Sequence, residues 1–223
     1  MSSITDNLAA IEHTLPENVT LVAVSKFHPA DALLEAYNAG QRVFGESRVQ
    51  ELSAKAPQLP ADIRWHFIGH LQTNKVRPLL RLRPALIESI DSERLLQAVD
   101  AEAAAQGIIQ NVLLQLHVAM EETKSGFLAE ELLDYFRQRR FETLKATHLC
   151  GVMGMASNTD DRTRVCADFR AIAATHKAIT DICPDLRGFS TVSMGMSHDY
   201  PLAIAEGSNM VRVGTAIFGE RQY

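Results

Sequence analysis

The chain has 223 residues, of which 46% are hydrophobic and 22% charged, and its formal net charge is −5. This composition is ordinary for a soluble globular protein, and a weakly acidic chain offers no basic field for nucleic acid or an anionic membrane surface. No apolar run approaches the roughly 18 residues of a membrane span, and the N-terminus lacks a basic region followed by an apolar one. We therefore expect a cytoplasmic protein that binds neither nucleic acid nor membranes.

The first elements form one β/α unit. Apolar residues at helical spacing predict an amphipathic helix at 3–15. The run from Leu21 to Lys26 predicts a strand buried on both faces. A helix over 29–37 follows, with a proline in its first turn and Gly40 as a stop signal.

The same alternation repeats along the chain. Further strands are expected at 42–45, 65–69, 85–90, 112–118, 149–153, 189–194 and 210–214. Helices are expected from about 48, at 75–82, after Asp91-Ser92, at 130–139, within 160–182, at 200–206 and from 215. Eight strands alternating with helices, without a linker, predict a single-domain (β/α)8 TIM barrel over residues 1–223, with an extra N-terminal helix. An open dinucleotide-binding sheet would need G-x-G-x-x-G after the first strand, and Ser25-Lys26-Phe27-His28-Pro29 does not provide it.

Lys26 stands at the C-terminal end of the first strand, where barrels and parallel sheets keep their ligands. We interpret it as the reactive residue. The alternative is a lysine that only caps a strand at the solvent edge.

Two loops near the end of the chain predict a phosphate site. Ser193-Met194-Gly195-Met196-Ser197 follows the seventh strand, and Gly214-Thr215 opens the helix after the eighth. Barrels frequently bind phosphate between these loops, because glycine lets backbone N–H groups approach and a helix N-terminus offers unpaired donors. The alternative is that the glycine-serine loop is only a turn.

Arg212 lies inside the eighth strand, where a positive charge is costly unless it is paired or aimed at a ligand. Its partner is either a carboxylate such as Glu46 or Glu88, or a ring nitrogen that must accept from the guanidinium. A reactive lysine, a phosphate cradle and a donor to a ring nitrogen are together the requirements of pyridoxal 5′-phosphate (PLP).

The histidines lack metal-site spacing, and Cys150, Cys166 and Cys183 form no C-x-x-C pair, so we expect reduced core thiols and no metal site.

These residues belong to a longer ordered set of motifs between about Leu21 and Gly219. The set comprises Val24-Ser25-Lys26, Phe44-Gly45-Glu46, Val49-Gln50-Glu51, Trp65 to Gly69, Leu71-Gln72-x-Asn74-Lys75, Lys124-Ser125-Gly126, Ser193 to Asp199 and Val211 to Gly219. With them the chain resembles the pyridoxal phosphate homeostasis protein family, also called the YggS or PROSC family.

The resemblance implies a barrel like the N-terminal domain of alanine racemase, with PLP held as an internal aldimine on Lys26. It further implies that Ser197, Gly214 and Thr215 hold the phosphate and that Arg212 faces the pyridine nitrogen. Three positions depart from the family's usual pattern: Ser47, His70 and His117 stand where asparagine, proline and asparagine are common. We expect His70 and His117 near strand ends that face the cofactor. They either alter the imine chemistry there or, as the favoured alternative, are satisfied core or rim histidines.

Two classes of function compete: a non-catalytic protein of PLP homeostasis and a PLP-dependent amino-acid racemase or decarboxylase. Racemisation needs acid/base groups on both faces of the substrate, and Tyr200 is the only tyrosine near the predicted site. The chain's length leaves no room for the second domain that supplies this group in racemases. We therefore predict a carrier with no catalytic residues, whose candidate recipients are apo PLP enzymes. A Schiff-base aldolase is a third alternative.

Overall fold

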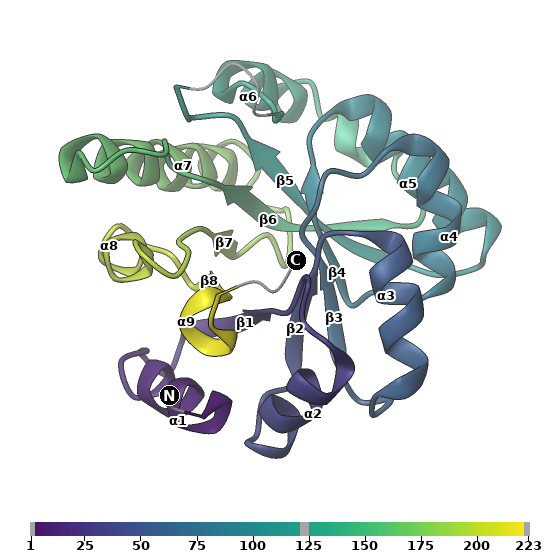
Figure 1. The fold of residues 1–223 in the computed structure, drawn as a ribbon. Coiled ribbons are helices and arrows are strands. Elements are labelled where there is room, and N and C mark those ends of the chain that lie inside the picture. Colours follow the sequence, from purple (N-terminus) through teal and green to yellow (C-terminus); the bar gives the residue numbers. More distant parts are fainter. Residues whose placement is uncertain (1–2, 121–124, 221–223) are drawn as a thin grey trace.

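The computed structural model describes residues 3–120 and 125–220, and its strands form a closed barrel (Figure 1). Each strand pairs in parallel with the next along the chain, and β8 closes the barrel on β1. The strands are β1 (Thr20–Val24), β2 (Val43–Glu46), β3 (Arg64–Phe67), β4 (Leu86–Ile90), β5 (Gln110–Leu116), β6 (Thr147–Gly154), β7 (Thr191–Ser193) and β8 (Met210–Val213). The predicted barrel is confirmed.

Helices surround the barrel, and α1 lies outside it beside α2 and α9 (Figure 1). The α-helices are α1 (Ile4–Glu12), α2 (Ala30–Asn38), α3 (Val49–Lys55), α4 (Val76–Arg81), α5 (Glu93–Ala105), α6 (Ala129–Arg137), α7 (Arg162–Ile182), α8 (Tyr200–Ala205) and α9 (Thr215–Phe218). Short 3-10 helices occupy η1 (Ala56–Gln58), η2 (Thr73–Lys75) and η3 (Arg140–Thr143). Within the described residues, no helix combines the length and apolar character needed to cross a membrane.

Local signals set the ends of these helices. The Ser3 hydroxyl accepts from Asp6 N, and the Asp6 carboxylate accepts from Ser3 N, so a capping box begins α1. The Ser92 hydroxyl accepts from Leu95 N and so caps the start of α5. The predicted first helix ran to residue 15, but α1 ends at Glu12. Pro16 disfavours helix at Leu15, the predicted end.

The strands separate two apolar clusters. Alternate strand residues face outward against the helices, and their cluster includes Leu21, Ala23 and Phe44. The inward residues form a smaller cluster inside the barrel: Val22, Val43, Leu86, Leu113, Met153 and Met210. Arg212 is the register partner of Val22, so it also faces the interior, where it meets the polar side chains described below.

Candidate cofactor-binding site

The five predicted binding residues line one cavity of about 270 Å³. They are Lys26, Ser197, Arg212, Gly214 and Thr215. They come from the chain after β1, the loop after β7, the strand β8 and the start of α9. The cavity therefore lies at the carboxyl ends of the strands, where a barrel carries its ligand sites.

Two glycines let the loops that are predicted to hold phosphate pack closely on their neighbours. Gly195 has φ +95°, and a Cβ there would lie 2.6 Å from Ala203 Cβ, so the loop can pack on α8 only with glycine. A Cβ at Gly214 would lie 3.1 Å from Val24 O, so the absence of a side chain lets the start of α9 approach β1 closely. Both loops are thereby held beside the turn that carries Lys26.

The Ser197 hydroxyl lies where two backbone N–H groups meet. Its Oγ accepts from Gly214 N at 3.2 Å and from Ala216 N at 3.4 Å. Two backbone donors thus converge on one oxygen at the cavity wall. A phosphate oxygen would find the same donors there, which is the fit expected of an anion cradle.

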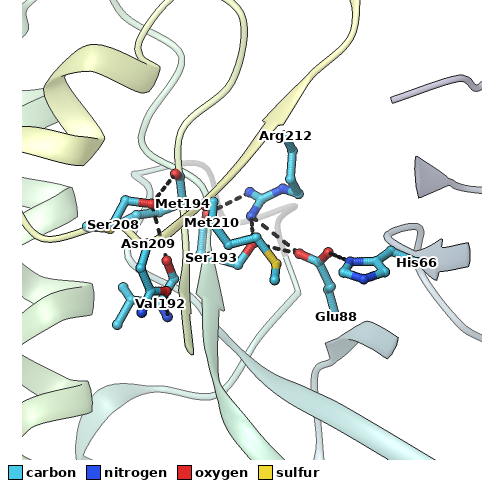
Figure 2. Close-up of polar contacts among 10 residues, drawn as sticks. His66, Glu88, Val192, Ser193, Met194, Ser208, Asn209, Met210 and Arg212 are labelled. Carbon is cyan, nitrogen blue, oxygen red and sulfur yellow. Dashed lines mark hydrogen bonds and ion pairs between the residues drawn. The ribbon is translucent and has the colours of Figure 1, made fainter. Parts of the chain in front are cut away.

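A serine bridge fixes β8 against the end of β7. Ser208 Oγ lies within hydrogen-bond distance of three carbonyl oxygens, those of Val192, Met194 and Met210 (Figure 2). Arg212 N also donates to Gly195 O at 3.0 Å. The glycine loop and the strand that carries Arg212 therefore form one unit.

Arg212 belongs to a buried chain of polar side chains that crosses the barrel interior (Figure 2). Its Nη1 donates to Ser193 Oγ at 2.6 Å, and its Nη2 donates to Gly154 O at 2.9 Å. Ser193 Oγ lies 2.6 Å from Glu88 Oε2, and Glu88 Oε1 lies 2.7 Å from His66 Nδ1. We call His66, Glu88, Ser193 and Arg212 the Glu88 cluster.

The donors and acceptors of the Glu88 cluster can be assigned. A guanidinium only donates and a carboxylate only accepts, so Ser193 accepts from Arg212 and donates to Glu88. His66 Nδ1 must then carry the hydrogen that Glu88 accepts. Both oxygens of Glu88 have hydrogen-bond partners, and Arg212 Nη1 lies 3.7 Å from Glu88 Oε2.

Charge and burial oppose each other in this cluster. Burial alone would raise the pKa of Glu88, but the bond and charge of His66, the charge of Arg212 and the bond of Ser193 lower it below its ordinary value. Burial lowers the pKa of Arg212, against the opposing effect of Glu88. Arg212 thus has a carboxylate beside it and also lines the cavity, so the two alternatives weighed for it are compatible.

Glu46, the other candidate partner of Arg212, pairs with a different residue. Its Oε1 accepts from Lys55 Nζ at 2.8 Å and from Ser25 Oγ at 2.6 Å. Lys55 also donates to Glu51 Oε1 at 2.7 Å. We call Ser25, Glu46, Glu51 and Lys55 the Glu46 cluster.

The Glu46 cluster is less completely paired. Glu46 Oε2 is buried and has no hydrogen-bond partner within residues 3–120 and 125–220. Burial raises the pKa of Glu46, although the bond and charge of Lys55 and the bond of Ser25 lower it in part. Lys55 is only 7% exposed. The sequence analysis did not identify it, because a lysine in an amphipathic helix usually lies on the solvated face.

The positions that depart from the family pattern do not line the cavity. His70 is exposed and lies 3.1 Å from Asp91 Oδ2. His117 and Ser47 are half-buried and are absent from the cavity wall. Neither His70 nor His117 is among the residues that line this cavity, although His117 directly follows β5. Their effect on the cofactor stays a prediction. Lys124 lies outside the described residues.

Several cavity residues had not been predicted as ligands. They are Val24, His28, Ile68, Met153, Met155, Met196 and His198. His28 follows Lys26 in the same turn, and its ring stacks on Phe218 at 5.0 Å between centroids. Proximity to Lys26 was the signal that could have identified it.

Comparison with known proteins gives the same picture. The family model described as "Alanine racemase, N-terminal domain" matches residues 1–222. A pyridoxal phosphate homeostasis protein from Helicobacter pylori is 40% identical over 213 residues, covering 95% of this chain and 92% of the relative. One from Schizosaccharomyces pombe is 39% identical over 206 residues, covering 92% and 85%.

Solved structures agree with these matches. PipY of Synechococcus elongatus without PLP is 37% identical and superimposes with a TM-score of 0.92, covering 97% of this chain and all of that one. The structure of PipY with PLP bound superimposes with a TM-score of 0.88 over the same shares. Alanine racemase from E. faecalis, 18% identical with a TM-score of 0.73, matches 97% of this chain and 57% of its own length, and so is similar in fold.

Proposed function

The chain belongs to the family of pyridoxal phosphate homeostasis proteins, and from this premise we propose that it binds PLP covalently on Lys26 and takes part in intracellular PLP homeostasis without catalysing a reaction. The observation that carries the proposal is the cavity itself. A lysine, a buried arginine and a turn of converging N–H groups all line it. The three parts come from opposite ends of the sequence, and they match the aldehyde, the ring nitrogen and the phosphate of PLP.

Each residue has a distinct part in this proposal. Lys26 Nζ provides the amine, and Gly214 and Thr215 provide backbone donors for phosphate beside the Ser197 hydroxyl. Arg212, held by Ser193 and Gly154 O, provides a donor that keeps the ring nitrogen unprotonated. When bound, the cofactor supplies an aldehyde carbon that condenses with the lysine amine, and the aldehyde oxygen leaves as water.

Two observations support a carrier over a racemase or decarboxylase. The Tyr200 hydroxyl lies 3.0 Å from Thr14 Oγ1, beyond the end of α1, and the cavity wall does not include Tyr200. The described wall therefore offers no tyrosine as the second acid/base group, although His28 and His198 do line it. An arginine at the ring nitrogen also makes the ring a weak electron acceptor, which disfavours decarboxylation.

The covalent bond is tested on the purified protein. Incubation with PLP should produce an absorbance band near the violet edge, and borohydride reduction should fix the added mass on the peptide that contains Lys26. Lys26→Ala should lose both signals while keeping its fold, because a half-buried lysine in a turn contributes little packing. A retained band in Lys26→Ala would refute the assignment.

The ring contact is tested with Arg212→Gln. Arg212→Glu would place a second carboxylate beside the buried Glu88, so glutamine is the safer replacement. We expect a shifted absorbance spectrum and weaker PLP binding. An unchanged spectrum and affinity would show that Arg212 acts only as the partner of Glu88.

The absence of catalysis is tested with the PLP-loaded protein and a panel of L- and D-amino acids. Chirality, carbon dioxide and keto acid are followed, alongside transfer of PLP to an apo PLP enzyme. Loss of a positioned acid or base costs about 10² to 10⁴ in rate, so only trace turnover is expected. Several turnovers per second, dependent on Lys26, would favour an enzyme.

A further inference from the structure

We propose that Glu51 and Lys55 of α3 are positioning residues that hold the turn of Lys26 in the conformation needed for covalent attachment. The inference rests on the proposed function, because it concerns the same bond. Its observations are independent of the cavity wall, which neither residue lines. They concern the backbone on both sides of Lys26.

Lys55 holds the residue before Lys26. Its Nζ donates to Ser25 O at 2.8 Å, to Glu46 Oε1 at 2.8 Å and to Glu51 Oε1 at 2.7 Å. An ammonium group has three hydrogens, so all of its donors have an acceptor. Lys55 is also nearly buried, and its charge is therefore fixed in place behind the turn.

Glu51 holds the residue after Lys26. Its Oε1 accepts from Phe27 N at 2.5 Å. Phe27 has φ +69°, a left-handed conformation that a bulky residue rarely adopts without support from its surroundings. The Arg48 guanidinium lies 5.0 Å from the centre of the Phe27 ring and adds a contact from the residue before α3.

These contacts bind the backbone on both sides of Lys26 to one helix. Glu51 and Lys55 stand one turn apart on α3 and form an ion pair with each other, so Ser25 O and Phe27 N are both bound by one pair of residues. The Cα of Lys26 is thereby held relative to α3 and the cavity. Without this grip the left-handed turn at Phe27 would relax toward ordinary conformations, and the direction of the Lys26 side chain would vary.

The same contacts give the two lysines different roles. Lys55 is close to the Lys26 turn, but a nucleophilic amine needs a free electron pair, and the Lys55 nitrogen is surrounded by three acceptors. Covalent attachment should therefore occur on Lys26 and not on Lys55.

The test separates covalent attachment from binding of the rest of the cofactor. The variant is Glu51→Ala, and Glu51→Gln is its conservative partner, because the amide oxygen can still accept from Phe27 N. The matched control is Asp181→Ala, which removes the acid of the exposed Lys177–Asp181 pair at the same spacing on α7. Covalent attachment of PLP is followed by the violet absorbance and by the mass fixed with borohydride. Non-covalent binding is measured with pyridoxine 5′-phosphate, which carries an alcohol in place of the aldehyde.

If Glu51 positions Lys26, Glu51→Ala should slow covalent attachment by about tenfold. A change of this size in rate is what the loss of one interaction in the transition state produces. Its affinity for pyridoxine 5′-phosphate should stay within about twofold of the parent. Glu51→Gln and Asp181→Ala should behave as the parent, and no mass should appear on Lys55 in any variant.

Other results overturn the inference. If Glu51→Ala lost covalent attachment and analogue binding equally, Glu51 would have a general structural role. Poor folding of Glu51→Ala would lead to the same conclusion. An unchanged attachment rate would mean that Glu51 does not position Lys26. If the parent attaches PLP at neither lysine, the proposed function fails and the inference fails with it.

Discussion

Glu46 on β2 and Glu88 on β4 are both fully buried, yet their pKa values shift in opposite directions. In the Glu88 cluster both carboxylate oxygens have hydrogen-bond partners, and a histidine and an arginine lie within reach. In the Glu46 cluster Oε1 of Glu46 accepts from Lys55 and Ser25, and Oε2 lacks a hydrogen-bond partner within the described residues. The comparison shows that burial disfavours the charged form of both carboxyls. The number of partners decides whether that effect is offset and the pKa falls, or is not offset and the pKa rises.

The two clusters also differ in what they support. The Glu88 cluster ends at Arg212, so it holds a group that lines the cavity. The Glu46 cluster holds backbone on both sides of Lys26. One cluster fixes a side chain at the cavity, whereas the other fixes the turn from which the reactive side chain extends.

The largest expected difference between the clusters is in the stability of two matched variants. Glu88→Gln should lower the free energy of unfolding by about 3 kcal/mol, because Arg212 loses its buried counter-charge and an amide nitrogen cannot accept from Ser193 or His66. Glu46→Gln should cost about 1 kcal/mol, because the amide oxygen can still accept from Ser25 and Lys55. Urea unfolding followed by the fluorescence of Trp65, the single tryptophan, measures both. Equal losses would contradict the comparison.

The pH dependence of these variants should have opposite signs. The lowered pKa of Glu88 means that its stabilising contribution is present above the ordinary value of 4.5 and is lost as the pH falls through its folded pKa. The raised pKa of Glu46 means that its contribution is present below 4.5 and is lost as the pH rises through its folded pKa.

The advantage of the parent over Glu88→Gln should therefore grow with pH, and its advantage over Glu46→Gln should shrink. Urea unfolding at intervals from about pH 3.5 to 8 checks both slopes. Slopes of the same sign in the two series would show that the pairing of the two carboxylates is not what distinguishes them.

The smallest expected difference between the clusters is that between the two serines that bond the glutamates. Each Oγ lies 2.6 Å from a carboxylate oxygen. Ser193→Ala should cost about 2 kcal/mol, because Ser193 joins two charged groups. Ser25→Ala should cost about 1 kcal/mol, because Glu46 Oε1 keeps Lys55. The same unfolding measurement distinguishes them, and a larger loss for Ser25→Ala would reverse the order proposed here.

Much of this molecule follows from the sequence alone. Periodicity and turn residues give the eight β/α units, since each depends on residues close together in the chain. The barrel in turn places strand ends at one face, so Lys26, Ser197, Arg212, Gly214 and Thr215 could be assigned to one site, and the structure brings all five to one cavity.

Only the tertiary structure decided which buried charges meet. Ser193 and Glu88 are 105 residues apart, and whether they touch depends on the stagger of the closed barrel, which includes register shifts between β4 and β5 and between β5 and β6. The choice of Glu88 as the partner of Arg212, the burial of Lys55 and the direction of Tyr200 all depend on that closure. Local patterns show that a side chain faces inward, but the contacts it makes there are set by strands distant in sequence.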